Sequence, residues 1–305
     1  MGIVVFGSIN VDITVYGERL PGPGETVHGD RSAIALGGKG CNQAVAVARL
    51  GGQVKLVGRL GDDAFGALAR GELAAFGVSD ACVARDPVNA TGIAVIGVDA
   101  GGENCISIVG GANLGVDESD VDARLDVFEE ADILLVQLEI PRPAIRHAAK
   151  VVRATGGRVI LDPAPAPAHE HDLDALLAIT DIITPNETET EALTGIRPAT
   201  PEQAEQAAAV FQGKGVACAV IKMGAAGVYY SSDDGSGFVP PFAVHAVDSV
   251  AAGDCFNGGL AHALARGDGL GQAVRFAAAC GALATTKPGA SASAPNLAAV
   301  QRLLT

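Results

Sequence analysis

The chain has 305 residues, 49% of them hydrophobic, and its 35 acidic and 21 basic residues give a formal net charge of −14. This length suits one large α/β domain, and the acidic balance disfavours nucleic acid or an anionic membrane surface as the main partner. No apolar run approaches the ~18 residues of a membrane span. The N-terminus has no basic leader and none of the six cysteines forms a Cys-x-x-Cys pair, so we expect a cytoplasmic protein with reduced thiols.

Short β-branched runs alternate with helical patterns along the chain. Strands are expected at residues 3–7, 54–60, 92–99, 132–139, 158–162, 181–186 and 218–224. Helices are expected at residues 40–50, 62–76, 142–155, 201–213, 253–266 and 269–286. This alternation predicts an α/β fold with a doubly wound, mostly parallel sheet and helices on both faces.

Two segments, residues 12–35 and 90–110, interrupt the alternation with short strand-like runs and turns. They predict a small β-sheet, which would be either a flap over a site or a set of decorated edge strands. The chain shows no internal repeat and no interdomain linker, so residues 1–305 are expected to form one domain with these segments as excursions.

Polar residues follow several of the expected strands. Asn10 and Asp12 follow the first strand, and Glu139, Asp162 and Asn186 follow later ones. Ligands of open α/β sheets bind beyond the carboxyl ends of the strands, so these residues indicate a site. Asn10 and Asp12 project to the same side of an extended segment, which suits the vicinal hydroxyls of a sugar.

A glycine turn runs into a helix in "LGGKGCNQAVAVARLGG" (36–52) and puts Lys39 and Asn42 near the helix start. Its glycines permit close approach of a ligand to the backbone, although an ordinary strand-to-helix turn has the same pattern. Gly40 stands where a P-loop needs Ser or Thr, so a P-loop is excluded. No Gly-x-Gly-x-x-Gly follows the first strand, which leaves a dinucleotide site unsupported.

The run "TPNETET" (184–190) spaces Asn186 and Glu189 as a helix capping box. The same residues would also suit a phosphate contact and an acid that organises Mg²⁺ through water. The histidines of "HEHD" (169–172) lie in a Pro/Ala-rich connector, and we do not expect them to bind a metal.

The run "VDSVAAGDCFNGGLAHAL" (247–264) places Asp254 at the start of an amphipathic helix, directly after Ala251, Ala252 and Gly253. Bare backbone N–H groups at a helix N-terminus form an anion hollow. We expect this hollow to hold the γ-phosphoryl group of a nucleotide, with Asp254 beside it as the general base for an attacking hydroxyl.

These motifs, in their order, resemble those of the PfkB-type carbohydrate kinases over essentially the whole chain. The matching runs are "GSINVD" (7–12), "PGPGET" (21–26), "GGKGCNQA" (37–44), "GRLGDDAFG" (58–66), "QLE" (137–139), "DPAPA" (162–166), "ITPNETE" (183–189), "VDSVAAGDCFNGG" (247–259) and "TKPGASAS" (286–293). Within the family they are most similar to members that phosphorylate D-ribose. The resemblance implies ATP-dependent transfer to the 5-hydroxyl of D-ribose, with Mg²⁺ accompanying ATP.

The resemblance also implies roles for individual residues. The sugar would be held by Asn10, Asp12, Gly38, Lys39, Asn42, Glu139 and the base Asp254. The anion hole would be the backbone of Ala251, Ala252, Gly253 and Asp254. The nucleotide would meet Asn186, Lys222, Met223, Gly224, Ala225, Ala226, Gly227 and Gly253. Glu189 would belong to the Mg²⁺ network, and a monovalent cation such as K⁺ would be bound by Asp248, Val250, Ala284, Lys287, Gly289 and Ser293. The small sheet would be a lid that pairs two subunits in a homodimer.

Four positions depart from the family pattern. Lys222 and Cys255 stand where Thr is usual, and Ala278 and Asp162 stand where Asn is usual. Ala278 would loosen the choice of nucleotide, Cys255 is expected to be a buried small residue, and Asp162 is expected to be structural. A related kinase for 2-deoxyribose, fructose or adenosine stays open as an alternative. A non-catalytic sugar-binding protein is disfavoured because the base and the anion-hole glycine are retained.

Overall fold

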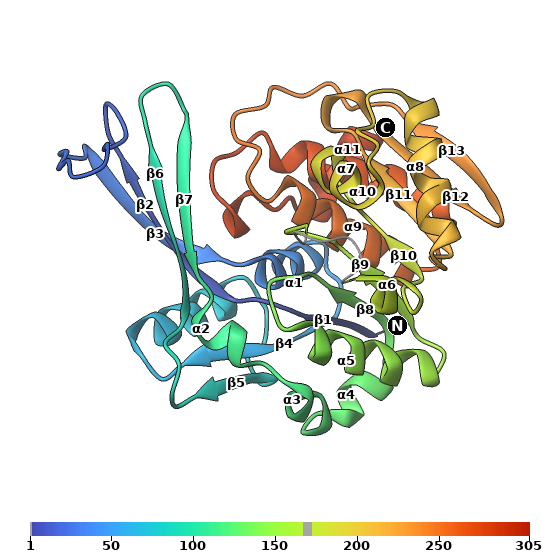
Figure 1. Cartoon of the computed structure of the whole chain (residues 1–305), viewed down its shortest axis with the longest axis horizontal. Helices are drawn as coiled ribbons and strands as arrows, with labels where there is room; N and C mark the ends of the chain where they lie inside the picture. Colours follow the sequence, from blue (N-terminus) through green and yellow to red (C-terminus); the bar gives the residue numbers. More distant parts are fainter. Residues whose placement is uncertain (1, 167–172) are drawn as a thin grey trace.

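A computed structural model describes residues 2–166 and 173–305 of the chain. Its main sheet has nine strands in the order β13-β12-β11-β10-β9-β8-β1-β4-β5 (Figure 1). The seven strands from β11 to β5 pair in parallel, and β12 and β13 add an antiparallel edge. The strands are β1 (Gly2–Phe6), β4 (Val54–Gly61), β5 (Val83–Asp86), β8 (Ala131–Val136), β9 (Arg158–Leu161), β10 (Ile182–Ile183), β11 (Cys218–Lys222), β12 (Val228–Ser232) and β13 (Gly235–Val239).

Helices cover both faces of this sheet. One apolar layer includes side chains of α1 (Lys39–Arg49), α2 (Ala64–Ala75), α9 (Ala252–Ala265), α10 (Leu270–Ala284) and α11 (Leu297–Leu304). The opposite layer includes side chains of α3 (Glu118–Asp122), α4 (Leu125–Glu129), α5 (Arg142–Ala154), α6 (Asp174–Leu177), α7 (Glu187–Thr194) and α8 (Pro201–Gly213). The doubly wound α/β prediction is therefore confirmed.

The central strands are buried on both sides, which is why their sequences are continuously apolar. In β1, Ile3 and Val5 pack into one layer, and Val4 and Phe6 pack into the other. Side chains of a strand alternate between the two faces of the sheet, so each strand supplies both cores. This packing fixes the register of the strands and therefore the position of the residues that follow their carboxyl ends.

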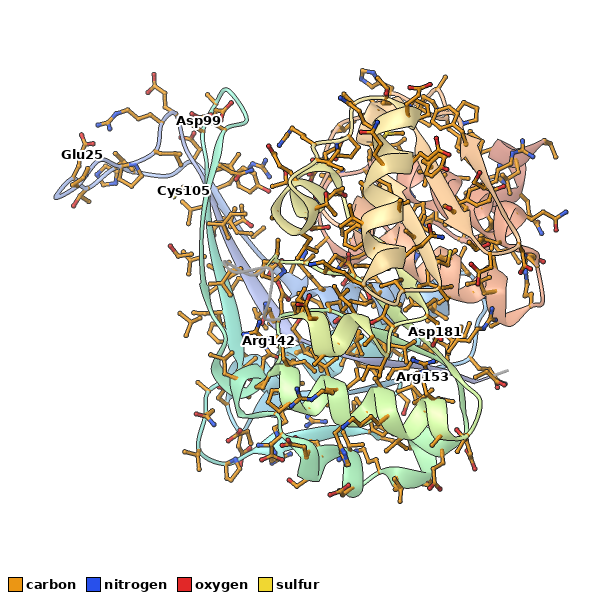
Figure 2. All side chains as sticks on the ribbon, turned by 45° about the vertical axis from the view of Figure 1, so that its right-hand side comes forward. Glu25, Asp99, Cys105, Arg142, Arg153 and Asp181 are labelled. Carbon is orange, nitrogen blue, oxygen red and sulfur yellow. The ribbon has the colours of Figure 1, made fainter. Side chains whose placement is uncertain are left out.

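A second, four-stranded sheet has the order β3-β2-β6-β7 and stands apart from the helical layers (Figure 1). Its strands are β2 (Asn10–Tyr16), β3 (Arg31–Gly37), β6 (Gly92–Val98) and β7 (Asn104–Val109). Figure 2 shows Asp99 and Cys105 at the end of this sheet that is remote from the helices. The two segments predicted to leave the main alternation thus supply its strands, and the strand expected at residues 92–99 belongs to this sheet.

Two expected strands are shorter than predicted, and one hairpin was missed. The strand expected at residues 181–186 is only two residues long, because Asn186 already caps α7. The strand expected at residues 132–139 ends at Val136, so Glu139 lies in the loop beyond it. The hairpin of β12 and β13 was not predicted, and the histidine-rich run at 169–172 lies outside the described residues.

Candidate active site

Polar side chains form a row along the carboxyl edge of the main sheet. Ser8 follows β1, Gln137 follows β8, Asp162 follows β9, Asn186 follows β10, and Lys222 ends β11. These five strands are consecutive neighbours in the sheet, in the order β11-β10-β9-β8-β1, so the row is continuous. This strand order brings the carboxyl ends of these strands to the edge where open α/β sheets bind ligands, and the site expected there stays a prediction.

The Glu139 side chain is hydrogen-bonded both to the residue that follows β1 closely and to the first residue of α1. Its Oε2 accepts hydrogen bonds from the Ser8 hydroxyl and from the Lys39 backbone N–H, the latter at 3.2 Å. Burial lowers the pKa of the Lys39 ammonium, but the carboxylates of Asp254, Asp162, Glu139 and Glu189 outweigh burial and raise it above its usual range. Lys39 is therefore a fixed positive charge among acids.

Close backbone contact puts α1 against β1. A Cβ at Gly40 would lie 2.6 Å from the carbonyl carbon of Gly7 and 2.7 Å from the Ser8 nitrogen. Gly38 has a φ of 89°, in the region that favours glycine, and a Cβ there would lie 2.8 Å from the Asn10 nitrogen. Both glycines are therefore required for α1 to bring Lys39 to the edge of the sheet.

Asp12 lies in β2, between Ala35 of β3 and Ala94 of β6, and the charge of Glu139 acts on it. A Cβ at Gly37 would lie 2.2 Å from the Asp12 Oδ2, so glycine there leaves room for the carboxylate. Burial, and then the nearby Glu139 carboxylate, raise the pKa of Asp12 to about 6. Carboxylate and amide groups that are buried together in this way suit the hydroxyls of a sugar, which need both donors and acceptors.

Asn113 orients Asn10, and sequence reasoning missed it. Its Oδ1 accepts from the Ile9 backbone N–H at 2.9 Å, and its Nδ2 donates to the Ile9 carbonyl at 3.1 Å and to the Asn10 Oδ1 at 2.7 Å. Asn113 lies in the short helix η1 (Gly111–Gly115), about one hundred residues beyond the strand that it supports. The partners are so far apart in sequence that no local pattern could have linked them.

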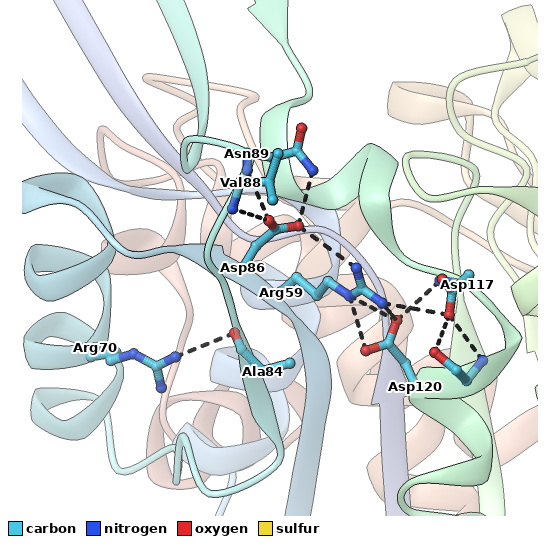
Figure 3. A network of polar contacts seen from close by, with 9 residues as sticks. Arg59, Arg70, Ala84, Asp86, Val88, Asn89, Asp117 and Asp120 are labelled. Carbon is cyan, nitrogen blue, oxygen red and sulfur yellow. Dashed lines mark hydrogen bonds and ion pairs between the residues drawn. The ribbon is translucent and has the colours of Figure 1, made fainter.

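Arg59 of β4 anchors the chain on both sides of η1 (Figure 3). Its Nε lies 2.9 and 3.0 Å from the Asp120 carboxylate oxygens, its Nη1 lies 3.6 Å from Asp86, and its Nη2 lies 3.5 Å from Asp117. Asp86 also accepts hydrogen bonds from two backbone N–H groups of the loop that leads to β6. The network therefore holds η1, and with it Asn113, beside the first strand.

Asp254 has only 6% of its surface exposed and is held from α1 by two amides. The Asn42 Nδ2 donates to its Oδ2 at 2.9 Å, and the Gln43 Nε2 donates to its Oδ1 at 3.1 Å. The Asn42 Oδ1 accepts from the Ser291 hydroxyl at 2.6 Å, so Asn42 is itself oriented. Each Asp254 oxygen keeps a lone pair for a further proton.

The helices α1 and α9 approach closely enough for these hydrogen bonds because α9 has small residues at the contact. A Cβ at Gly258 would lie 2.6 Å from the Ala46 Cβ and 2.8 Å from the Gln43 carbonyl oxygen. The pKa of Asp254 is raised to about 6, chiefly by burial. The positive charge of Lys39 opposes this rise, the negative charge of Asp162 adds to it, and the hydrogen bonds from Asn42 and Gln43 oppose it. A carboxyl group with this pKa is ionised at neutral pH and remains a competent base.

The start of α9 has the geometry of an anion hollow. Ala251 caps the helix with a φ of 58°, and among the described residues it alone has a positive φ without being glycine. Such a conformation costs about 1 kcal/mol and is typical of functional sites. The Ala252 N–H donates to the Ser249 carbonyl at 3.2 Å, whereas the next two amides of the first turn have no partner within the helix. One amide of the hollow predicted at residues 251–254, that of Ala252, is thus already bonded to the protein's own backbone.

The predicted nucleotide positions lie at the other end of the polar row. Asn186 and Glu189 form the capping box of α7, with three hydrogen bonds of 2.8 to 3.0 Å between them. Burial raises the pKa of Glu189, Lys222 lowers it, and Asp162 raises it. Because Asn186 donates to both carboxylate oxygens of Glu189, this acid suits a water-mediated contact with Mg²⁺ better than direct coordination.

Lys222 and Met223, which were predicted to meet the nucleotide, have side chains that already contact other parts of the protein. The Lys222 Nζ lies 3.3 Å from Asp162 Oδ1, and the pair is 12% and 3% exposed. The Met223 side chain packs into the apolar core, so only its backbone faces the turn. That turn, η3 (Gly224–Ala226), closes with a hydrogen bond of 2.9 Å from the Met223 N–H to the Gly227 carbonyl. Asp162, which was expected to be structural, thus pairs with Lys222 and also accepts a hydrogen bond from Gln43.

The loops predicted to bind a monovalent cation lie together. The Asp248 carboxylate accepts from the Val250 N–H and from the Gly289 N–H, both at 2.9 Å. The N–H groups of residues 247 and 248 donate to the Thr285 carbonyl. Ser293 is buried and belongs to η4 (Ser291–Ser293), shortly after Gly289 in the sequence. Ala284 ends α10, and Lys287 follows it in the same loop. Asp248 thus bridges the loop before α9 and the loop after α10.

The cysteines do not add reactive groups to the site. Burial, and then the negative charge of the neighbouring Asp254, raise the pKa of the Cys255 thiol to about 12. Cys41 is also buried with a raised pKa, and all six cysteines are free thiols. Ala278 is partly buried against the core of α10. Cys255 is therefore the buried small residue that was expected.

A buried acid at a helix N-terminus, beside polar residues at the carboxyl edge of a doubly wound sheet, suits an α/β kinase that phosphorylates a small molecule. Residues 2–297 match the pfkB family carbohydrate kinase profile, and the chain belongs to this family. Among curated proteins it is 40% identical over 294 residues to a ribokinase of Haemophilus influenzae, covering 96% of this chain and 95% of that protein. It is 34% identical over 298 residues to a deoxyribokinase of Salmonella typhi, covering 97% and 96%.

Solved structures agree with this assignment. The Arabidopsis thaliana ribokinase complexed with ribose and ATP has a TM-score of 0.92 and 37% identity, with 99% of this chain and 98% of that one covered. A putative ribokinase II of E. coli in complex with ATP and Mg²⁺ has a TM-score of 0.82 and 26% identity, with 99% and 98% covered. The predicted family and kinase class are confirmed.

Proposed function

We propose that the protein is a ribokinase that transfers the γ-phosphoryl group of ATP to the 5-hydroxyl of D-ribose. The observation that carries the proposal is the position of Asp254: its carboxylate is held by α1, whose first turn also bears Lys39, and it stands at the first turn of α9. One acid thus faces both the predicted sugar residues and the predicted anion hollow. The similarity to ribokinases at up to 40% identity supports ribose as the sugar.

The chain's own residues would supply binding, orientation and proton transfer. Asn10, Asp12, Lys39 and Glu139 would hold the ribose hydroxyls, with Asn113 and Ser8 keeping two of these side chains in place. The 5-hydroxyl would give its proton to Asp254 as its oxygen forms the new bond to phosphorus and the bond to ADP breaks. The N–H groups of Gly253 and Asp254 would stabilise charge on the transferred group.

The nucleotide would lie over the 222–227 turn and Asn186, with its terminal phosphate toward α9. Lys222 would contribute a positive charge from the side, since a Cβ at Gly253 would lie 3.5 Å from its Nζ. Mg²⁺ would neutralise phosphate charge when bound with ATP. Glu189 would hold water molecules of that ion, which agrees with its occupied oxygens.

A panel of acceptors tests the choice of sugar. We expect D-ribose to have the highest kcat/KM among ribose, 2-deoxyribose, fructose and adenosine, because the groups that meet the sugar include paired donors and acceptors for vicinal hydroxyls. The comparison should be made with one enzyme preparation at saturating MgATP. Equal or faster turnover of 2-deoxyribose would contradict the proposal and favour a deoxyribokinase, which the 34% identity to such an enzyme makes the relevant competitor.

We also propose a K⁺ site between the loops that Asp248 joins, built from the carbonyl oxygens of Val250, Ala284, Lys287 and Gly289 with Ser293. An ion there would shape the turn at Ala251 without touching substrate, since Asp248 is tied to Val250 and Gly289.

Replacing Na⁺ by K⁺ at constant ionic strength is therefore expected to raise kcat. Steady-state rates in the two chlorides give the comparison, and Asp248→Asn should reduce the difference. An equal rate in both salts, with the wild-type enzyme otherwise active, would contradict a functional cation site.

The small sheet is proposed to be a lid of this single domain and the contact between two subunits. The register puts Asp12 on one face with Ala35, Ala94 and Ile108. The other face carries Ile13 and the exposed side chains of Val15, Ile34, Val95 and Val109. An exposed apolar face of this kind is typical of a protein interface.

The proposed location is the cytoplasm, where ribose, ATP and free thiols occur together. In the described part of the chain, every helix is too short or too polar to cross a membrane.

A further inference from the structure

Gln43 lies at the centre of the site, although neither the mechanism above nor the sequence motif gives it a task. Its side chain has no exposed surface. The Nε2 donates to the Asp254 Oδ1 at 3.1 Å and to the Asp162 Oδ2 at 3.0 Å, and the Oε1 accepts from the Gln137 Nε2 at 2.6 Å. A single amide thus contacts two acids and a second amide.

The chemistry of the partners fixes the orientation of this amide. Both carboxylates can only accept, so the Nε2 of Gln43 must face them and its Oε1 must face Gln137. Glycine at position 7 leaves room for the Gln137 amide, because a Cβ there would lie 1.9 Å from the Gln137 Oε1. The Gln137 Nε2 can therefore reach the Gln43 Oε1 and orient the Gln43 amide.

Gln43 also connects the two sides of the reaction. The second oxygen of Asp162, Oδ1, pairs with the Lys222 Nζ at 3.3 Å. Lys222 lies beside Gly253, so a chain of contacts runs from Asp254 through Gln43 and Asp162 to Lys222 and returns to the start of α9. Asp162 and Lys222 both depart from the family pattern, and they are paired with each other in this series of contacts.

We propose, on the basis of the kinase function above, that Gln43 is a positioning residue for phosphoryl transfer. It holds the Asp254 carboxylate toward the substrate hydroxyl and keeps it ionised, and it links that base to Lys222 beside the anion hollow. The amide neither gains nor loses a proton. A neutral donor suits this place, because a charged residue at position 43 would add to the crowded charges of the site.

The effect on the base has a definite sign. The hydrogen bond from Gln43 lowers the pKa of Asp254, so its removal raises that pKa. A protonated Asp254 cannot accept the substrate proton, so activity falls as the pH drops through the pKa of Asp254, which is about 6. Removing Gln43 therefore moves the acid limb of the kcat/KM profile to higher pH. The charged and titratable groups that surround Asp254 and its partners are Lys39, Cys41, Glu139, Asp162, Glu189, Lys222 and Cys255.

The test compares Gln43→Met with Gln137→Met. Methionine keeps the length of glutamine and removes its donors. We expect Gln43→Met to lower kcat about 10- to 100-fold, with the KM values for ribose and ATP changed less than about threefold, and to shift the acid limb upward. Gln137→Met removes a partner of Gln43 but leaves both donors to the acids, so its acid limb should stay in place.

A readout without substrates separates this inference from the proposed function. The ¹³C resonance of the Asp254 carboxyl, assigned by its loss in Asp254→Asn, can be titrated in the free protein. We expect it to titrate at higher pH in Gln43→Met than in the wild type, whichever sugar the enzyme accepts. Should Gln43→Met fail to fold, Gln43→Asn, which is too short to reach both acids, replaces it. An unchanged titration and acid limb in a folded variant would overturn the proposal and leave Gln43 as a packing residue.

Discussion

Replacing Asp254 by asparagine is expected to lower kcat for ribose by roughly 10²- to 10⁴-fold while ribose binding stays largely in place. The change keeps the size of the side chain and one acceptor for Asn42 or Gln43, but it removes the group that takes the proton. Steady-state kinetics and calorimetric titration of ribose measure the two effects separately. The loss should appear in kcat and only weakly in the dissociation constant of the sugar.

Asp122→Asn provides the matched control, since it makes the same chemical change at an exposed hydrogen-bonded contact with His147. Surface pairs of this kind contribute little, so this variant should keep its kcat within about twofold. Near-normal turnover in Asp254→Asn would remove Asp254 from the role of base. A large loss of ribose affinity with unchanged kcat would assign it to sugar binding alone.

Gly40→Ala is expected to have the second-largest effect, on both stability and activity. The new Cβ would meet only backbone atoms, those of Gly7 and Ser8 at 2.6 to 2.7 Å, and backbone cannot move aside as a flexible side chain can. Overpacking of this kind costs about 1–3 kcal/mol. The start of α1 must move away from β1, which displaces Lys39, Asn42 and Gln43 together and is expected to lower kcat on the order of 10²-fold.

Gly71→Ala is the control for this prediction. Gly71 lies within α2, and a Cβ there would have no atom within 4 Å. Because alanine favours a helix more than glycine does, this variant should be stabilised by about 0.5–1 kcal/mol and keep its activity. Urea unfolding monitored by circular dichroism compares the two variants. A Gly40→Ala protein as stable and active as Gly71→Ala would contradict the close contact between α1 and β1.

The sequence predicted the elements that carry strong local signals. The apolar runs of β1 and β8 alternate between two cores. The glycines at positions 37 and 38 mark where α1 begins, and the small residues at positions 251–253 mark where α9 begins. Parallel strands bring their carboxyl ends to one edge, and the sequence placed its candidate site at the polar residues after those strands. Short elements such as β10 were predicted less well, because an N-cap such as Asn186 and a polar strand end look alike in sequence.

Residues that act through distant partners were not predicted. Asn113 orients Asn10 from 103 residues away, Ser291 orients Asn42 from 249 residues away, and Gln43 contacts Asp254 from 211 residues away. Such pairs depend on how α1, α9 and η1 pack around the sheet, and a single sequence has no local signal for that packing. The pairing of Asp162 with Lys222 also became visible only when β9 and β11 were placed on either side of β10.

The central claim is that Asp254 stands between the sugar hydroxyl and the terminal phosphate of ATP. A crystal structure with D-ribose and a non-hydrolysable ATP analogue bound together tests it most directly. The account predicts the 5-oxygen of ribose within hydrogen-bond distance of an Asp254 carboxylate oxygen and in line with the terminal phosphorus, which would rest against the first turn of α9. A ribose bound elsewhere, with the Asp254 carboxylate turned away from both ligands, would contradict it.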